Sequence, residues 1–394
     1  MLKVNNSKIN SENIDSIIKI CPFNAIEKSG DTIVINSACK MCKLCVKKSD
    51  GAIENIEEEV KKINKEEWKG LAVLAEVVCG KLHPVAKELI GEARNLADKT
   101  NQPVYALVIG YQTEGIVKDL QNAGADKIFV YDKEELKDFL IERHANVFED
   151  FINKVKPSAI LVGSTNLGRV LAPRVAARFR TGLTADCTML EIKENTDLVQ
   201  IRPAFGGNIM ARIVTPNARP QFCTVRYKIF SKLETPYKDA EVVKMAFDGI
   251  NLNSNIECIK NDETPAAFSI SDAEVIVAVG RGVKSKADLD EINEFAKLIN
   301  AQVACTRPLV ENGWFDAKNQ IGLSGRTVKP KLIFTFGISG SVQFVAGMQN
   351  SSLIISVNTD ENAPIFNVAH IAVCGDYKQV LKELIHKIKE GENV

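Results

Sequence analysis

The sequence predicts a mixed α/β protein, with two doubly wound α/β domains preceded by a small α+β domain. Three observations lead to this prediction. Short apolar runs alternate with amphipathic segments after residue 71, residues 1–62 lack long apolar runs, and four of the ten cysteines fall between Cys21 and Cys45. Short continuous apolar strands separated by helix-spaced segments indicate βαβ units around a buried parallel sheet.

The first alternating region spans residues 66–257 and predicts one Rossmann-like domain. We expect strands at 71–78, 104–109, 127–131 and 159–163, and helices at 84–99, 113–122, 134–155 and 167–180. Residues 188–226 have strand patterns with turns and no clear helix, which predicts an antiparallel addition at the edge of the sheet. The polar stretch 231–267 predicts a domain boundary.

A second alternating region spans residues 265–394 and predicts another compact doubly wound domain. We expect strands at 275–279, 302–306, 332–336, 353–357 and 371–373, and helices at 286–300, 342–348 and 377–390.

Composition excludes several function classes. The chain has 50 Lys and Arg against 50 Asp and Glu, so no net charge favours nucleic acid or a membrane surface. The N-terminus lacks the apolar segment of a signal peptide, and no apolar run approaches the roughly 20 residues of a membrane span. The sequence therefore predicts a cytoplasmic protein that binds neither nucleic acid nor membrane.

The clustered cysteines predict a metal site in the first domain, residues 1–62. Cys39, Cys42 and Cys45 form a C-x2-C-x2-C run, and Cys21 precedes a proline. In bacterial ferredoxins a Cys-Pro element ligates the cluster of the other cysteine run, so Cys21 is the expected fourth ligand. The segment resembles a bacterial ferredoxin reduced to one [4Fe–4S] cluster, because no earlier cysteine run and no cysteine near Lys48 exist. A zinc knuckle is the alternative, although zinc favours two paired ligand sets.

The other cysteines are scattered singly among apolar residues. In a cytosolic chain such thiols pack as small hydrophobic groups, so we expect them to be buried. They are Cys79, Cys187, Cys223, Cys258, Cys305 and Cys374.

Three loops of the last domain carry small residues directly after expected strands. They are Gly280-Arg281-Gly282, Ser339-Gly340-Ser341 and the loop that begins at Asn358. Loops at the carboxyl ends of parallel strands form the binding crevice of such a sheet, and small residues let backbone N–H groups approach a phosphate. Each loop alone has the simpler explanation of a tight turn.

Longer motifs make this region resemble the alpha subunit of electron transfer flavoproteins. The matching segments are GRGVKS at 280–285, TRP at 306–308, GLSGR at 322–326, GISGSVQFVAGM at 337–348, VN at 357–358 and APIF at 363–366. The resemblance runs from about Leu71 to the C-terminus and implies that the last domain binds FAD.

The resemblance also implies roles for single residues. Arg281, Thr306 and the loop 339–343 match residues that hold the FAD phosphates and ribityl chain, and Arg307 matches an arginine lying over the flavin ring. Leu323 and Ser324 match the pair lining the flavin, with the Ser324 hydroxyl in reach of N5. The expected FAD-binding residues are Arg281, Thr306, Arg307, Gly322, Leu323, Ser324, Gly325, Ser339, Gly340, Ser341, Val342, Gln343, Phe344, Asn358, Gly375 and Asp376, the last three matching the adenosine end.

Phe344 departs from the family pattern, which commonly has a histidine at this position to stabilise charge on the flavin. Phenylalanine cannot donate a hydrogen bond. We therefore expect Phe344→His to raise the one-electron potential of the flavin.

Two glycine-bearing segments, 181–188 and 202–208, resemble the flavin-bifurcating branch of the family, although they also fit ordinary surface loops. The resemblance implies a beta subunit that carries its own FAD and binds NADH, ferredoxin as one electron acceptor, and an acyl-CoA dehydrogenase or enoyl-CoA reductase type flavoprotein as the other partner. Thr184 and Asp186 are the candidate contacts with the partner's flavin.

This chain would then be an electron-transferring subunit that is not catalytic by itself. Complexes that reduce caffeyl-CoA are the preferred kind, and lactate dehydrogenase complexes are second. A non-bifurcating carrier and a nucleotide-binding module with a zinc knuckle are the alternatives.

Overall fold

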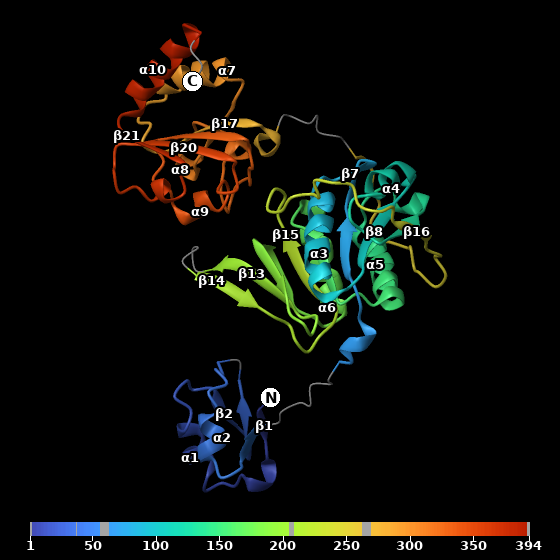
Figure 1. The fold of residues 1–394 in the computed structure, drawn as a ribbon. Coiled ribbons are helices and arrows are strands. Elements are labelled where there is room, and N and C mark those ends of the chain that lie inside the picture. Colours follow the sequence, from blue (N-terminus) through green and yellow to red (C-terminus); the bar gives the residue numbers. More distant parts are fainter. Residues whose placement is uncertain (1, 37, 56–62, 205–208, 262–268, 392–394) are drawn as a thin grey trace. The chain divides into compact units, whose positions relative to one another are not determined.

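The chain, shown in Figure 1, divides into two units, Met1–Ile63 and Asn64–Val394. The computed structural model describes residues 2–36, 38–55, 63–204, 209–261 and 269–391. Within those ranges, none of the helices is long and apolar enough to cross a lipid bilayer.

In its described residues, the first unit contains two short antiparallel strand pairs and two α-helices. The pairs are β1 (Leu2–Val4) with β4 (Ile53–Asn55) and β2 (Ile26–Ser29) with β3 (Thr32–Ile35). The helices are α1 (Ile14–Lys19) and α2 (Leu44–Lys48). Isoleucines from both helical and strand segments, among them Ile14, Ile17 and Ile33, form a small buried core with Cys45.

A seven-stranded parallel sheet organises residues 64 to about 250. Its strand order is β11 (Leu183–Cys187), β15 (Gln221–Val225), β10 (Ala159–Gly163), β5 (Leu71–Ala75), β8 (Val104–Gly110), β9 (Lys127–Asp132) and β16 (Glu241–Lys244). Every side chain of β5 and β10 is buried, as expected for central strands that are covered on both faces. The predicted parallel α/β architecture is therefore confirmed for this region.

Helices cover both faces of this sheet because alternate residues of each strand point to opposite sides. Leu71 and Val73 pack toward α3 (Val85–Thr100) and α4 (Glu114–Leu120). Ala72 and Leu74 pack toward α5 (Ile141–Val155) and α6 (Asn166–Arg178).

The region 188–226 differs in part from the prediction. The strands β12 (Met189–Ile192), β13 (Leu198–Ala204) and β14 (Ile209–Ile213) do form an antiparallel sheet. However, β15 lies inside the parallel sheet, between β11 and β10, so the expectation of an antiparallel edge was wrong for 221–225. A strand was also missed at β16, which pairs with β9.

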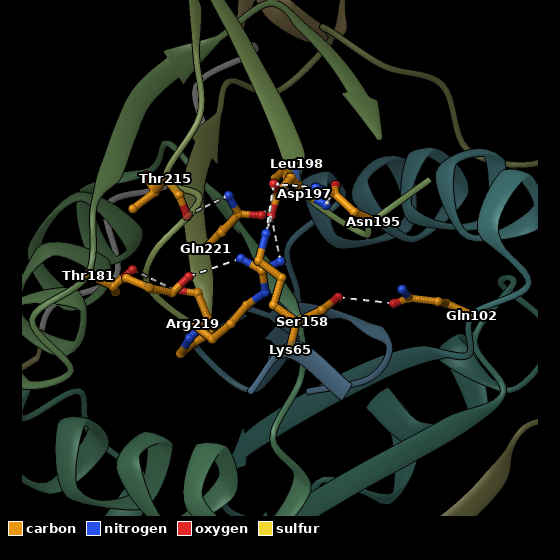
Figure 2. Close-up of polar contacts among 12 residues, drawn as sticks. Lys65, Gln102, Ser158, Thr181, Asn195, Asp197, Leu198, Thr215, Arg219 and Gln221 are labelled. Carbon is orange, nitrogen blue, oxygen red and sulfur yellow. Dashed lines mark hydrogen bonds and ion pairs between the residues drawn. The ribbon is translucent and has the colours of Figure 1, made fainter. Parts of the chain in front are cut away.

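A network of buried polar side chains anchors the antiparallel sheet (Figure 2). The Asp197 carboxylate accepts hydrogen bonds from Arg219 Nη2 at 2.6 Å and from Lys65 Nζ at 2.8 Å. Nearby, Gln221 Oε1 accepts from Leu198 N at 2.6 Å, and Gln221 Nε2 donates to Thr215 O at 3.0 Å. These contacts join the start of β13 to the start of β15 and to the beginning of the second unit.

A five-stranded parallel sheet organises the C-terminal part. Its order is β18 (Gln302–Cys305), β17 (Val275–Val279), β19 (Leu332–Phe336), β20 (Leu353–Asn358) and β21 (Ile371–Cys374). In Figure 1, α7 (Asp288–Leu298) and α10 (Tyr377–Lys389) lie on one face and α9 (Val342–Val345) on the other, in agreement with the two buried clusters. The chain leaves β17 toward β18 and later returns to β19 on the other side, so a topological switch point lies between β17 and β19.

The scattered cysteines follow the prediction only in part. Cys187, Cys223 and Cys305 are buried, but Cys79, Cys258 and Cys374 are exposed. Cys79 lies at the turn of a short hairpin, β6 (Val77–Val78) with β7 (Lys81–Leu82), where no layer covers it.

Candidate functional site

A cavity of about 630 Å³ opens at the carboxyl ends of β17, β19, β20 and β21. This is the switch point of the five-stranded sheet, where open α/β sheets bind their ligands, and the volume is typical of a cofactor site. The cavity brings together some of the residues expected to bind FAD. They are Arg281, Thr306, Ser339, Ser341, Asn358, Gly375 and Asp376.

Close backbone packing fixes the loops around this cavity. A Cβ atom on Gly280 would lie 2.5 Å from Gly337 O, and one on Gly340 would lie 2.2 Å from Ile365 N. Gly340 also has a φ of +87°, which favours glycine. Asn358 Nδ2 donates to Ile338 O at 2.8 Å, which ties the end of β20 to the loop after β19.

Two cations line the cavity beside the loop after β17. Arg281 and Lys284 line the cavity, and neither forms an ion pair with any residue that the structure describes. Lys378 instead pairs with Asp288, at 2.8 Å, and Tyr377 donates to the same carboxylate at 2.8 Å. These two hydrogen bonds hold the pKa of Asp288 below its ordinary value.

The sequence analysis did not predict several residues that line the cavity. Asp288, Thr359, Tyr377 and Lys378 also line the space. Asp376 caps α10 by accepting from Lys378 N at 2.9 Å, so this helix begins at the cavity. The expected helix after the last strand could have indicated these residues, because helices that follow parallel strands begin at the same edge of the sheet.

The other expected FAD residues lie on neighbouring loops rather than in this cavity. Arg307 is exposed at the start of α8 (Arg307–Glu311) and donates through Nε to Glu311 at 2.8 Å. Leu323 N donates to Gln343 O at 2.9 Å, and Ser324 Oγ accepts from Gln320 Nε2 at 2.8 Å. The remaining members of this group are Gly322, Gly325, Gly340, Val342 and Phe344.

Phe344 is buried in an apolar cluster, with 3 % of its surface exposed. The neighbours in this cluster include Ile321, Val328 and Met348. Its ring therefore packs in the protein core.

The cysteines of the first unit lie on two connected loops. Asn36 N donates to Ala25 O at 2.9 Å, and Cys39 N donates to Asn36 O at 3.2 Å, which joins the loop after Cys21 to the loop of the cysteine run. Backbone N–H groups point at two of the sulfurs. Cys21 Sγ accepts from Ala25 N at 3.3 Å, and Cys39 Sγ accepts from Met41 N at 3.4 Å.

The four thiols differ in exposure. Cys45 is buried, Cys21 and Cys39 are half-buried, and Cys42 is exposed. Burial raises the pKa of the Cys45 thiol, backbone hydrogen bonds lower it, and the charges of Cys39 and Cys42 raise it further. Across the described ranges, however, no group of three or more His, Cys, Asp or Glu side chains is arranged to hold a metal ion.

Asp186, one of the two candidate interface residues of the middle sheet, lies in an ion-pair network. Asp186 accepts from Ser164 and pairs with Arg226 at 2.8 Å and with Arg169 at 3.0 Å. Burial raises the pKa of Asp186, but these partners outweigh it and lower the pKa to about 2. Thr184 is buried. In the segment 202–208, residues 205–208 lie outside the described part of the chain.

Comparison with known proteins identifies the family. Residues 71–249 match the electron transfer flavoprotein domain, and residues 269–349 match the electron transfer flavoprotein FAD-binding domain. The chain is 55 % identical over 396 aligned residues to the LctC subunit of lactate dehydrogenase (NAD(+),ferredoxin) from Acetobacterium woodii, covering 100 % of this chain and 94 % of that protein.

Two further relatives match most of the chain. It is 41 % identical to the electron transfer flavoprotein subunit alpha of Clostridium acetobutylicum, over 84 % of this chain and 100 % of that one. It is 38 % identical to the acryloyl-CoA reductase electron transfer subunit beta of Anaerotignum propionicum, over 83 % and 97 %. With the matching FAD-binding domain, these similarities show that the chain belongs to the electron transfer flavoprotein family as an alpha-type subunit.

Proposed function

We propose that the chain is the alpha subunit of a flavin-bifurcating complex and carries FAD and one [4Fe–4S] cluster. A beta subunit with its own FAD oxidises NADH, and electrons leave toward ferredoxin and toward a partner dehydrogenase. The observation that carries this proposal is a similarity over the whole chain, cysteine unit included, to a protein whose name combines lactate dehydrogenase, NAD⁺ and ferredoxin. The alpha subunit from Clostridium acetobutylicum matches only 84 % of the chain.

The C-terminal cavity fits FAD on its own geometry. Gly280 and Gly340 leave no space for a side chain, which keeps the loops after β17 and β19 packed closely against their protein neighbours at the cavity. Arg281 and Lys284 offer cations for a pyrophosphate, and Asn358 and Asp376 lie where an adenosine would bind. Bound FAD supplies one-electron and two-electron transfer, while these residues hold and orient it.

The four thiols fit an iron–sulfur cluster by donor chemistry. Thiolates are the ligands of [4Fe–4S] clusters, and N–H groups that point at the sulfurs, as at Cys21 and Cys39, stabilise their negative charge. A ferredoxin-like fold for this unit is part of the same proposal. Its β–α–β–β–α–β order places one helix in each half of the unit. Cys21 from the first half would then ligate the cluster that the cysteine run of the second half holds.

The spacing supports one cluster rather than two. A complete run ending at Cys21-Pro22 would have cysteines at positions 11, 14 and 17. Those positions hold Ser11, Ile14 and Ile17, and both isoleucines are buried in the core. The fourth position of the second run is Ser49, whose hydroxyl accepts from Ile53 N at 3.0 Å just as Cys21 Sγ accepts from Ala25 N. Apolar packing has thus replaced one set of ligands.

The partner dehydrogenase is proposed to act on the pair of lactate and pyruvate, with pyruvate as the electron acceptor when NADH is oxidised. The one-cluster form favours an enoyl-CoA of the caffeyl-CoA type, whereas the whole-chain relative carries lactate in its name. An acyl-CoA remains the second candidate because a relative is named for acryloyl-CoA reductase.

The test is a coupled assay on the complex with its beta subunit and dehydrogenase. An anaerobic visible spectrum and metal analysis first distinguish an iron–sulfur cluster from zinc. NADH oxidation is then followed with ferredoxin and either pyruvate or an enoyl-CoA. A bifurcating complex reduces ferredoxin only while the second acceptor is present. NADH oxidation that needs no ferredoxin would instead identify the non-bifurcating carrier.

A further inference from the structure

Two large apolar side chains are exposed next to the cysteines of the first unit. Phe23 is 44 % exposed and Met41 is 47 % exposed. Phe23 follows Cys21 by two residues, and Met41 stands between Cys39 and Cys42. The unit buries its isoleucines, so the exposure of these two side chains has no explanation in its own core. Aromatic and methionine side chains are enriched in protein–protein interfaces.

The loops that carry these side chains are held side by side. The backbone of Asn36 bonds to Ala25 on one loop and to Cys39 on the other, and Asn36 Nδ2 donates to Asn24 O at 3.5 Å. Phe23 and Met41 are therefore exposed on two loops that are bonded to one another, and Cys42 is exposed beside Met41.

Unpaired lysines border this apolar centre. Residues 39–48 contain Lys40, Lys43, Lys47 and Lys48 and no acidic residue. All four lysines are exposed, and none pairs with a carboxylate anywhere in the described ranges. Lys43 directly precedes α2 and its carbonyl accepts from Lys47 N at 3.3 Å, so the two lysines lie within one turn of chain. The result is an apolar centre with a basic rim, which we call the Cys42 face: Phe23, Met41 and the four lysines.

We propose that the Cys42 face docks a small electron-carrier protein with an acidic surface. The proposal rests on the proposed cluster, because docking at this face would bring the carrier next to the exposed sulfur of Cys42, a proposed cluster ligand. A basic rim selects an acidic partner, accelerates encounter and makes association depend on salt. The apolar centre supplies the part of the association that salt does not screen.

Two other roles for the lysines give different results. Lys47 and Lys48 lie in the last turn of α2, where cations stabilise the helix carbonyl groups. Lys40 and Lys43 also adjoin thiolates whose charge they would offset. The first role changes the stability of the unit and the second changes the cluster potential, and neither gives salt-dependent binding of a second protein.

The test uses the complete complex and a purified acidic [4Fe–4S] ferredoxin as probe. The variants are Lys43→Gln/Lys47→Gln and Phe23→Ser, and the matched control is Lys3→Gln/Lys28→Gln. Lys3 on β1 and Lys28 on β2 are exposed lysines away from the cysteines and have no ion pair among the described residues. Calorimetry gives the Kd at about 0.1 M and about 1 M salt, where charges act over about 10 Å and about 3 Å.

We expect the lysine pair variant to weaken binding about tenfold at low salt and negligibly at high salt. Phe23→Ser should weaken binding at both salt concentrations, and the control pair at neither. Equal losses in variant and control would overturn the proposal, as would unchanged binding in both variants with the cluster spectrum intact. A shifted cluster potential with unchanged binding would assign the lysines to the cluster instead. A wild-type chain without a cluster spectrum would defeat the proposed function, whereas the salt-dependent binding of ferredoxin would still test the face.

Discussion

The buried carboxylate of Asp197 offers a sharp test of the energetics of the middle domain. Its side chain is 4 % exposed, and that of its partner Arg219 is completely buried. Asp197→Asn keeps the shape but removes the negative charge, which leaves the Arg219 guanidinium buried without a counter-ion (Figure 2). Removing one partner of a buried ion pair costs about 3–5 kcal/mol, so we expect a loss of this size in the free energy of unfolding.

The stability that Asp197 contributes should depend on pH in a defined direction. Burial raises the pKa of Asp197, but hydrogen bonds from Lys65 and Arg219 outweigh it and hold the pKa below the ordinary value of 3.8. A lowered folded-state pKa contributes stability above the unfolded value, and this stability is lost as the pH falls through the folded value. The difference between wild type and Asp197→Asn should therefore be constant from neutral pH to about pH 5 and shrink below about pH 4.

The assay is urea unfolding followed by the fluorescence of Trp68, which packs against the core of the middle sheet. A Trp314→Phe background removes the only other tryptophan. Glu274→Gln is the control, because its ion pair with Lys331 is more than two thirds exposed on both sides and is worth at most about 1 kcal/mol. A cost below about 1 kcal/mol for Asp197→Asn would refute the reasoning, since an unpaired buried guanidinium cannot be that inexpensive.

Three further predictions concern single residues. Burial raises the pKa of Glu88 to about 7, so the free energy of unfolding should fall by up to about 3 kcal/mol as the pH rises from 4.5 through 7. Glu88→Gln should abolish this dependence, which unfolding curves at pH 5 and pH 8 would measure. Gly340→Ala should lower the FAD bound per purified chain, measured by flavin absorbance, because its Cβ would collide with Ile365 N. Ile17→Ala should destabilise the first unit by about 2–5 kcal/mol, measured by hydrogen exchange of its amides, and a loss below about 1 kcal/mol would contradict the tight packing of Ile17.

The alternation of strands and helices was predictable because it depends on local patterns. The central strands β5 and β10 are buried on both faces and read as continuous apolar runs. The edge strand β16 is mostly exposed and has no such run, so only its pairing with β9 identifies it. The start of α5 was misplaced for a related reason. Leu136 and Leu140 are spaced as in a helix and both are buried, yet α5 begins at Ile141.

The cavity was predictable where loops follow neighbouring strands. Arg281, Ser339 and Asn358 come together because parallel strands end at one edge of the sheet. The pair of Asp288 and Lys378 was not predictable, because it joins the first turns of two helices that are far apart in the sequence. The sequence also does not show which loops line the cavity. Ser324, for example, was expected to bind FAD but lies outside the cavity, where its hydroxyl accepts from Gln320.

Phe344 shows what a matching sequence position leaves undetermined. The match gives the place of residue 344 in the chain, but the ring direction depends on the apolar cluster into which it packs. A histidine in this cluster would be desolvated, as is His144, whose pKa burial lowers to about 4. An imidazole that stays in this cluster would be neutral, so any effect of Phe344→His on the flavin would not come from a positive charge. The expected rise in the one-electron potential should then be the same from pH 6 to pH 8, and a rise that grows toward pH 6 would show a protonated ring outside the cluster.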